Sequence, residues 1–201
     1  MVANIRSVGD IYRLLPTQEH AREFLEEMVW PKGRFCPLCG SDRSSRLHGR
    51  STRPGLYQCR ERACRRQFTV TTRTPMHATK LDLRTWILAF FLVLTSSKGI
   101  SSVVLARHLG VTQKAAWRMG HAIRQMMEAE GAGNELLRGI VEVDETFVGG
   151  APKYRKGVKN KRGKGTRKQI VLVAATRDGK ARAARVTSGA RKAIQPVMDR
   201  W

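Results

Sequence analysis

The chain has 201 residues, of which 41% are hydrophobic, so it can bury one ordinary core or several small ones, and this excludes a disordered polymer. Lys and Arg number 38 against 16 acidic residues, a formal net charge of +22. This excess indicates a polyanionic partner, because displacing the counterions condensed on a phosphate backbone favours binding. A charge that serves solubility alone, or a ribosome-associated RNA-binding protein, would show the same excess.

No segment of the sequence is predicted to span a membrane. The longest apolar run, from Trp86 to Leu94, has nine residues, whereas a helix needs about 20 to cross a bilayer. Residues 1–15 carry charges and lack the apolar core of a secretory signal. We therefore expect a cytoplasmic protein without membrane contact, in which reduced cysteines serve as metal ligands rather than as disulfides.

Residues 1–33 are predicted to hold an N-terminal helix. Thr17 can cap it and Glu19 suits its first turn, since both positions favour oxygen-bearing or acidic side chains. Trp30 to Gly33 ends it. Its apolar face comprises Ala21, Phe24, Leu25, Met28 and Val29.

Residues 34–79 contain all four cysteines, as the pairs Cys36/Cys39 and Cys59/Cys64, which are separated by nineteen residues. Two turns that each offer two thiolates supply the tetrahedral set that zinc prefers, and a short basic segment needs such a link to fold. We predict a zinc ribbon with strands at 56–58 and 67–70. The zinc is structural, because four protein ligands leave no open position; four unconnected thiols are the alternative.

Residues 80–130 are predicted to be helical. Asp82 can cap a helix that carries Trp86, and two shorter helices flank Gly110. Helix, glycine-containing turn and helix is the order of a helix-turn-helix, although ordinary helical bundles share it. Residues at the start of the second helix are then expected to reach base edges or phosphates. They are Thr112, Gln113, Lys114 and Arg118.

The inner side of this second helix is predicted from its helical spacing. Trp117 is expected in the core or at its rim. The residues expected to pack inward are Ala116, Met119, Ile123 and Met126.

Residues 139–201 change to a β pattern, with strands expected at 140–144, 170–175 and 180–186 and an Asp178-Gly179 hairpin turn. Strand alternation places Glu142 and Asp144 on one face. Carboxylates on a rigid strand suit Mg²⁺, and two such ions about 4 Å apart can activate attacking and leaving oxygens in phosphodiester chemistry. Ion pairs with nearby lysines are the alternative explanation of these acids.

A basic segment follows, from Lys153 to Lys168. It contains no acid, and three glycines interrupt it. We interpret it as a phosphate-gripping loop, with a solvated linker as the alternative. Its cationic residues are Lys153, Arg155, Lys156, Lys159, Lys161, Arg162, Lys164, Arg167 and Lys168.

Taken together, these segments resemble the zinc-ribbon DDE transposases of bacterial insertion sequences, the ISXO type. The residues that carry the resemblance are the Cys36/Cys39 knuckle, Arg65–Val70, Thr79–Trp86, Ser96–Ser101, Leu109–Met119 and Val141–Gly150.

The resemblance implies an α+β multidomain chain that ends in the first strands of an RNase H-like α/β domain. Asp144 would be the first catalytic acid, with Glu142 and Glu145 as weaker candidates, and magnesium or manganese would be the catalytic ion. It further implies double-stranded DNA as partner, at terminal inverted repeats and target sites. A bacterial, nucleoid-associated location and a homo-oligomeric transposition complex are expected as well.

The family pattern calls for two further metal-binding residues. After Glu145 the chain contains the acids Asp178 and Asp199 alone, and Asp178 is explained by its turn. We therefore expect a C-terminally truncated, catalytically incomplete domain. A zinc-ribbon DNA-binding regulator or inactive transposase relic is the alternative from another class, and a ribosome-associated RNA-binding protein is a third.

Overall fold

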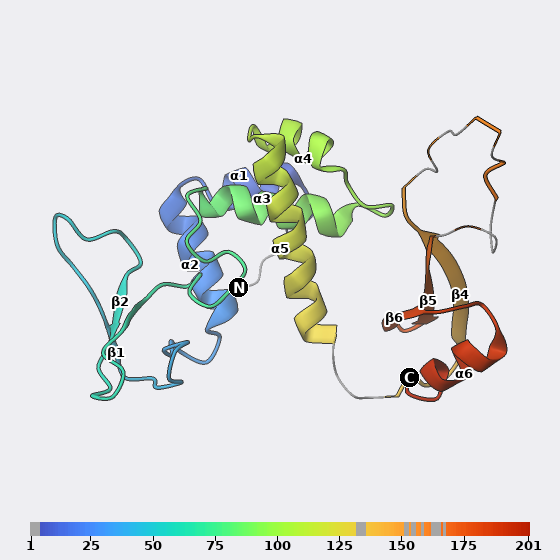
Figure 1. Cartoon of the computed structure of the whole chain (residues 1–201). Coiled ribbons are helices and arrows are strands. Elements are labelled where there is room, and N and C mark those ends of the chain that lie inside the picture. The colour runs from blue at the N-terminus through green and yellow to red at the C-terminus, as the bar shows by residue number, and fades with distance from the viewer. Residues whose placement is uncertain are drawn as a thin grey trace. The chain divides into compact units, whose positions relative to one another are not determined.

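The computed structural model describes residues 5–131, 136–150, 153, 156–157, 159–161, 166 and 168–201. The chain divides into two compact units, Met1–Ala129 and Glu130–Trp201 (Figure 1). Within the described residues the architecture is mixed α and β, with six helices and two three-stranded sheets, one sheet in each unit. No helix in these residues is both long enough and apolar enough to cross a bilayer.

Two helices, rather than the single one expected, open the first unit. α1 spans Val8–Leu14, and a capping box starts it: Ser7 accepts from the backbone of Asp10, whose carboxylate accepts in return from the backbone of Ser7. α2 spans Gln18–Val29 and is capped by Thr17, as predicted. α1 was not expected from the sequence, because a helix of seven residues shows little periodicity.

The cysteine-rich segment forms a small antiparallel sheet in the order β1-β2-β3. Its strands are β1 (Ser44–Arg46), β2 (Tyr57–Cys59) and β3 (Gln67–Phe68). β2 has the predicted length but begins one residue later, and β3 is shorter than the predicted strand at 67–70. β1 was not expected, because Ser-Ser-Arg has no β-branched or aromatic residue.

An aromatic cluster joins this sheet to the helices. The indole of Trp30 lies edge-on to Tyr57 and Phe68, with ring centroids 5.7 Å and 6.1 Å away. Tyr57 donates a hydrogen bond to Glu26 of α2 at 2.7 Å. The same buried core includes Cys36 and Cys59, and also Ile87 and Leu88 from the next helix, α3 (Leu83–Thr95). The ribbon is therefore packed on α2 rather than tethered to it.

The rest of the first unit is helical. Gly110 adopts the left-handed conformation, with φ of 65°, and so ends one helix and turns the chain into the next. Ala116, Met119 and Ile123 are almost fully buried and Met126 is partly buried, which confirms the predicted inner side. The helices are α3 (Leu83–Thr95), α4 (Ser102–Leu109) and α5 (Gln113–Gly131).

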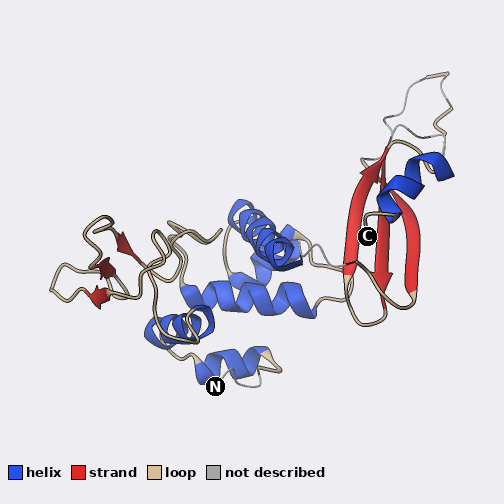
Figure 2. Ribbon diagram, turned by 90° about the horizontal axis from the view of Figure 1, so that it is seen from below, coloured by secondary structure: helices blue, strands red, loops and turns tan. Residues whose placement is uncertain are grey.

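The second unit contains an antiparallel meander and one helix. Its elements are β4 (Val141–Val148), β5 (Gln169–Thr176), β6 (Ala181–Val186) and α6 (Arg191–Met198). α6 packs on one sheet face through Leu172, Val186 and Val197 (Figure 2). The β5–β6 turn is the predicted Asp178-Gly179 hairpin, with φ of 94° at Gly179 and Thr176 bonded to the backbone of Lys180 at 2.8 Å.

Candidate metal centres and nucleic-acid surface

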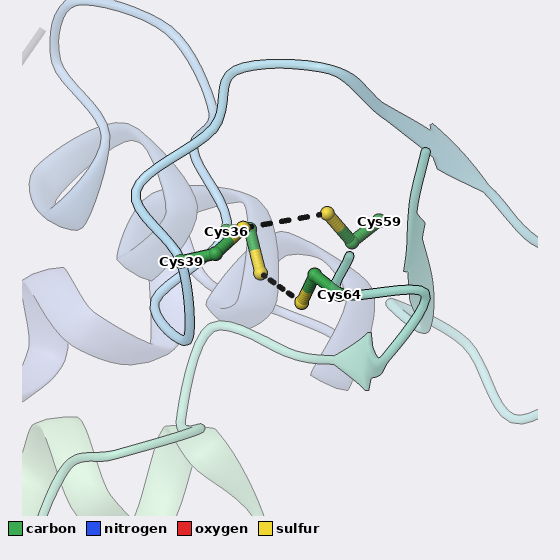
Figure 3. Close-up of side chains that lie close together, drawn as sticks. All are labelled: Cys36, Cys39, Cys59 and Cys64. Atoms are coloured by element: carbon green, nitrogen blue, oxygen red, sulfur yellow. Dashed lines mark hydrogen bonds between the residues drawn. The ribbon is translucent and has the colours of Figure 1, made fainter. Parts of the chain in front are cut away.

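The four cysteines lie together, as predicted. Their sulfur atoms are all within 4.8 Å of one another. The sulfurs of Cys36 and Cys64 are 3.9 Å apart and those of Cys39 and Cys59 3.6 Å apart (Figure 3). A tetrahedral zinc with bonds of about 2.3 Å separates its sulfurs by about 3.8 Å. The donor set and its spacing therefore fit a structural zinc ion.

Backbone turns place each pair. The amide of Cys36 bonds the carbonyl of Ser41, and Gly40, with φ of 79°, returns its amide to the Cys36 carbonyl. In the second pair the amides of Cys64 and Arg65 both bond the carbonyl of Glu61, and Arg65 takes the left-handed conformation. The longer spacing between Cys59 and Cys64 is thus accommodated by a different turn.

Four thiols this close together cannot all ionise unless a cation is bound. Burial raises the pKa of Cys59, and the neighbouring thiols of Cys64 and Cys36 add to the rise. A backbone hydrogen bond at Ser41 lowers the pKa of Cys39, but desolvation and its three cysteine neighbours outweigh it and raise that pKa to about 12. A divalent ion removes this repulsion, which is why such a cluster binds metal in place of protons.

The three carboxylates of β4 differ in the sheet face they occupy and in their partners. Glu142 accepts hydrogen bonds from Arg177 at 3.1 Å and 3.3 Å, so an ion pair explains this residue, with an arginine in place of the expected lysine. Asp144 is exposed on the same face, and its carboxylate accepts from the Glu145 amide at 2.8 Å. In the described part of the chain no cation pairs with Asp144.

Glu145 lies on the opposite face of β4. It pairs in register with Leu172, a core residue beneath α6. A Cβ built on Gly189 would collide with its carboxylate, which places the Glu145 side chain just ahead of the first turn of α6. Because the amino end of a helix favours an acid, Glu145 has a structural explanation.

The later acids also have local explanations. A hydrogen bond from Thr176 lowers the pKa of Asp178, which fixes this carboxylate in the hairpin. Asp199 caps the end of α6 and accepts from Gln195 at 2.8 Å. Among the five acids from Glu142 to Asp199, Asp144 is thus the one whose position no ion pair, turn or cap in the described residues explains.

The predicted DNA-contacting residues lie at the start of α5. Thr112, Gln113, Lys114 and Arg118 are all exposed. Thr112 caps the helix by accepting from the Ala115 amide at 3.2 Å, and Gln113 donates to Ser102 of α4 at 2.8 Å. Thr112 and Gln113 therefore also stabilise the turn between α4 and α5, while Lys114 and Arg118 are exposed to solvent.

Trp117 is the feature of this surface that sequence reasoning missed. It was expected in the core or at its rim; it is 52% exposed, which excludes the core, and its ring lies 4.2 Å from that of His121, one turn on. The spacing of Gln113, Trp117 and His121, four residues apart, was the available signal, because such positions share one helix face. The exposed side of α5 therefore combines cations with an aromatic surface.

The basic segment connects β4 to β5. Lys153, Lys156, Lys159 and Lys161 are exposed, and Lys168 is half-buried. The last ladder pair, Val148 with Gln169, is four residues from Asp144, or about 13 Å along the strand. The other predicted contacts, Arg155, Arg162, Lys164 and Arg167, lie outside the described residues.

Comparison with known proteins identifies two segments of the chain. Residues 16–67 match the transposase zinc-ribbon domain, and residues 136–201 match the ISXO2-like transposase domain. An uncharacterized protein in the transposable element ISH50 of Halobacterium salinarum is 26% identical over 149 residues, which cover 74% of this chain and 48% of that protein. The chain thus spans about half the length of this curated relative. No solved structure matches this chain.

The first match contains all four clustered cysteines, and the second contains β4 with Asp144. Both families are transposase domains, and they follow one another in the order that the sequence motifs indicated. The chain is therefore similar, over these two segments, to transposases that have a zinc ribbon and an ISXO2-like domain.

Proposed function

We propose that the protein is a DNA transposase that binds the ends of an insertion sequence and contributes Asp144 to a metal-dependent strand-cleavage and transfer site. The observation that carries this proposal is the position of Asp144 inside the ISXO2-like segment. Its carboxylate is exposed and has no cationic partner in the described residues, whereas Glu142 pairs with Arg177 and Glu145 lies on the other sheet face.

The meander supports an RNase H-like domain. Three antiparallel strands followed by a helix, with the acid on the first strand, is the order that the resemblance implies. Mg²⁺ takes six oxygen ligands, and one carboxylate supplies two at most. The described residues thus fit one corner of a magnesium or manganese site rather than a whole one. We expect the 201-residue polypeptide to bind DNA without cleaving it.

DNA binding is proposed for the first unit, with α4, the Gly110 turn and α5 as a helix-turn-helix. The exposed Lys114 and Arg118 stand near the start of α5, where recognition helices meet base edges and phosphates. The single zinc ion proposed for Cys36, Cys39, Cys59 and Cys64 has no catalytic part, because four sulfurs complete the tetrahedron. Terminal inverted repeats and target DNA are the proposed ligands.

Binding and cleavage are tested separately. Fluorescence anisotropy with a duplex of the element's terminal repeat should show weaker binding for the double variant Lys114→Gln/Arg118→Gln than for the wild type. An unchanged affinity would refute the helix-turn-helix assignment. Incubation of the same duplex with Mg²⁺ should leave it intact, and nicking by the 201-residue chain would contradict the proposed incompleteness of its metal site.

The regulator alternative is tested in cells. Excision of a marker flanked by the terminal repeats is measured with a transposase gene that carries the catalytic segment in full. Asp144→Asn should abolish excision while anisotropy stays at the wild-type value, because the carboxylate serves the metal and not DNA affinity. Excision that survives Asp144→Asn would favour a DNA-binding regulator.

A further inference from the structure

A groove of about 420 Å³ lies between the segment Pro75–Leu81 and the first half of α5. It falls between the two matched segments, 16–67 and 136–201, so neither domain family describes it. One wall contains His77 and Lys80, and the other contains Lys114 and Arg118. Residues more than thirty positions apart in sequence therefore meet at one site.

The charge of this groove is uniformly positive. None of its lining residues is acidic. Lys80, Lys114 and Arg118 are exposed, and within the described residues no carboxylate pairs with any of them. Three cations on facing walls repel one another, and an anion placed between them removes that cost. The groove thus suits a phosphate group.

The loop wall is fixed in place before any ligand arrives. The Thr79 hydroxyl accepts hydrogen bonds from Trp86 Nε1 at 2.9 Å and from the Leu81 amide at 3.1 Å. Met76 is 4% exposed and packs in one cluster with Met119 of α5. Ala78 takes a left-handed φ of 56°, a strained conformation for a residue with a Cβ. Lys80 is therefore presented by a rigid segment.

We infer that this groove binds a backbone phosphate of duplex DNA, with Lys80 as the contact from outside the helix-turn-helix. The inference rests on the proposed DNA binding by α5. When the start of a recognition helix enters the major groove, the segment beside it faces the adjoining phosphodiester strand. Phosphate contacts of this kind set the register of the protein on the duplex and read no sequence themselves.

The test is the salt dependence of duplex binding, measured by anisotropy with the zinc-loaded chain. Each phosphate contact adds about 0.9 to the slope of log K against log salt, so Lys80→Gln should bind with a slope smaller by about 0.9. Between about 50 and 200 mM salt, its affinity should then fall by about 3.5-fold less than that of the wild type. The loss should be equal for terminal-repeat and scrambled duplexes.

Two variants control for charge and for folding. Lys32→Gln removes the same charge from an exposed turn outside the groove, and it should change the slope by much less. Lys80→Arg should restore the wild-type slope, since it returns the cation. Circular dichroism melting should give one transition temperature for all three variants, because no described contact depends on the Lys80 side chain.

The outcomes separate this inference from the proposed function. If Lys114→Gln/Arg118→Gln weakens binding while Lys80→Gln behaves like Lys32→Gln, the groove is not a phosphate site although α5 still binds DNA. If neither the double variant nor Lys80→Gln affects binding, the proposed helix-turn-helix itself is wrong. A slope reduced by Lys80→Gln and restored by Lys80→Arg establishes the contact.

Discussion

Glu142 accepts hydrogen bonds from both Nε and Nη2 of Arg177, at 3.3 Å and 3.1 Å, on the β4 face that also carries Asp144. Both side chains of the pair are largely exposed, so the pair contributes little to stability. The pair matters for position, because strand alternation places two carboxylates on the same face and the guanidinium of Arg177 binds one of them. Of these two acids, Asp144 is the one that has no cationic partner among the residues that the structure describes.

The first prediction concerns this difference. Asp144→Asn should weaken Mn²⁺ binding, measured by electron paramagnetic resonance titration, because it removes the ligand charge. Glu142→Gln should leave the affinity nearly unchanged, because Arg177 already neutralises that carboxylate. Weak, about millimolar affinity is expected for the wild type, since a site with few carboxylates binds poorly. A larger loss from Glu142→Gln than from Asp144→Asn would reverse the assignment.

The second prediction concerns the cysteine cluster. Removal of zinc by a chelator should unfold the first unit rather than loosen one loop, because Cys36 and Cys59 belong to the core that contains Trp30. Structural zinc contributes several kcal/mol or more to folding. Loss of the Trp fluorescence emission typical of a buried indole would report it. Zinc binding should also depend on pH. Cys39, with a pKa of about 12, is protonated without metal and releases its proton when zinc binds, so zinc affinity falls as pH falls.

Cys39→Ser provides the genetic counterpart. Cys39 is the exposed member of the cluster, so its replacement removes a ligand with little change in packing. Zinc content, measured by a colorimetric assay after denaturation, should drop well below one ion per chain. A Cys39→Ser protein that retains a full zinc ion and its melting temperature would contradict a four-cysteine site.

The third prediction concerns the contact between the ribbon and α2. Gly55 has φ of 74°, and a Cβ at this position would overlap the side chain of Arg22, which is 5% exposed. Gly99 has φ of 75° and nothing within 4 Å of its Cβ position. Gly99→Ala should therefore cost about 1 kcal/mol for the left-handed backbone alone. Gly55→Ala should cost more by the displacement of Arg22, measured by urea unfolding; equal costs would show that Arg22 moves aside freely.

The sequence predicted well where local chemistry decides the structure. Cysteine spacing identified the cluster, Gly110 the turn before α5, and Asp178-Gly179 the hairpin. Alternation along β4 also placed Glu142 and Asp144 together. In each case the determining residues are close in sequence or of a type with few alternative uses.

It failed where distant segments decide the structure. The pairing of Glu142 with Arg177 depends on the β4–β5 register, and the groove at Lys80 depends on how α5 packs against a loop. The exposure of Trp117 depends likewise on which side of α5 the other helices cover. Residue type favoured the core or its rim for this indole, and the packing of the helices leaves about half of it exposed.

The last prediction concerns the basic segment between β4 and β5. Lys159→Gln/Lys161→Gln removes two exposed cations, so the slope of log K against log salt for duplex binding should fall by about 1.8 if both contact phosphates. Arg191→Gln/Lys192→Gln removes two exposed cations from the start of α6 in the same unit and serves as the matched control. A phosphate-gripping loop predicts a large difference between the two double variants. A solvated linker predicts none, because diffuse charge affects both variants alike.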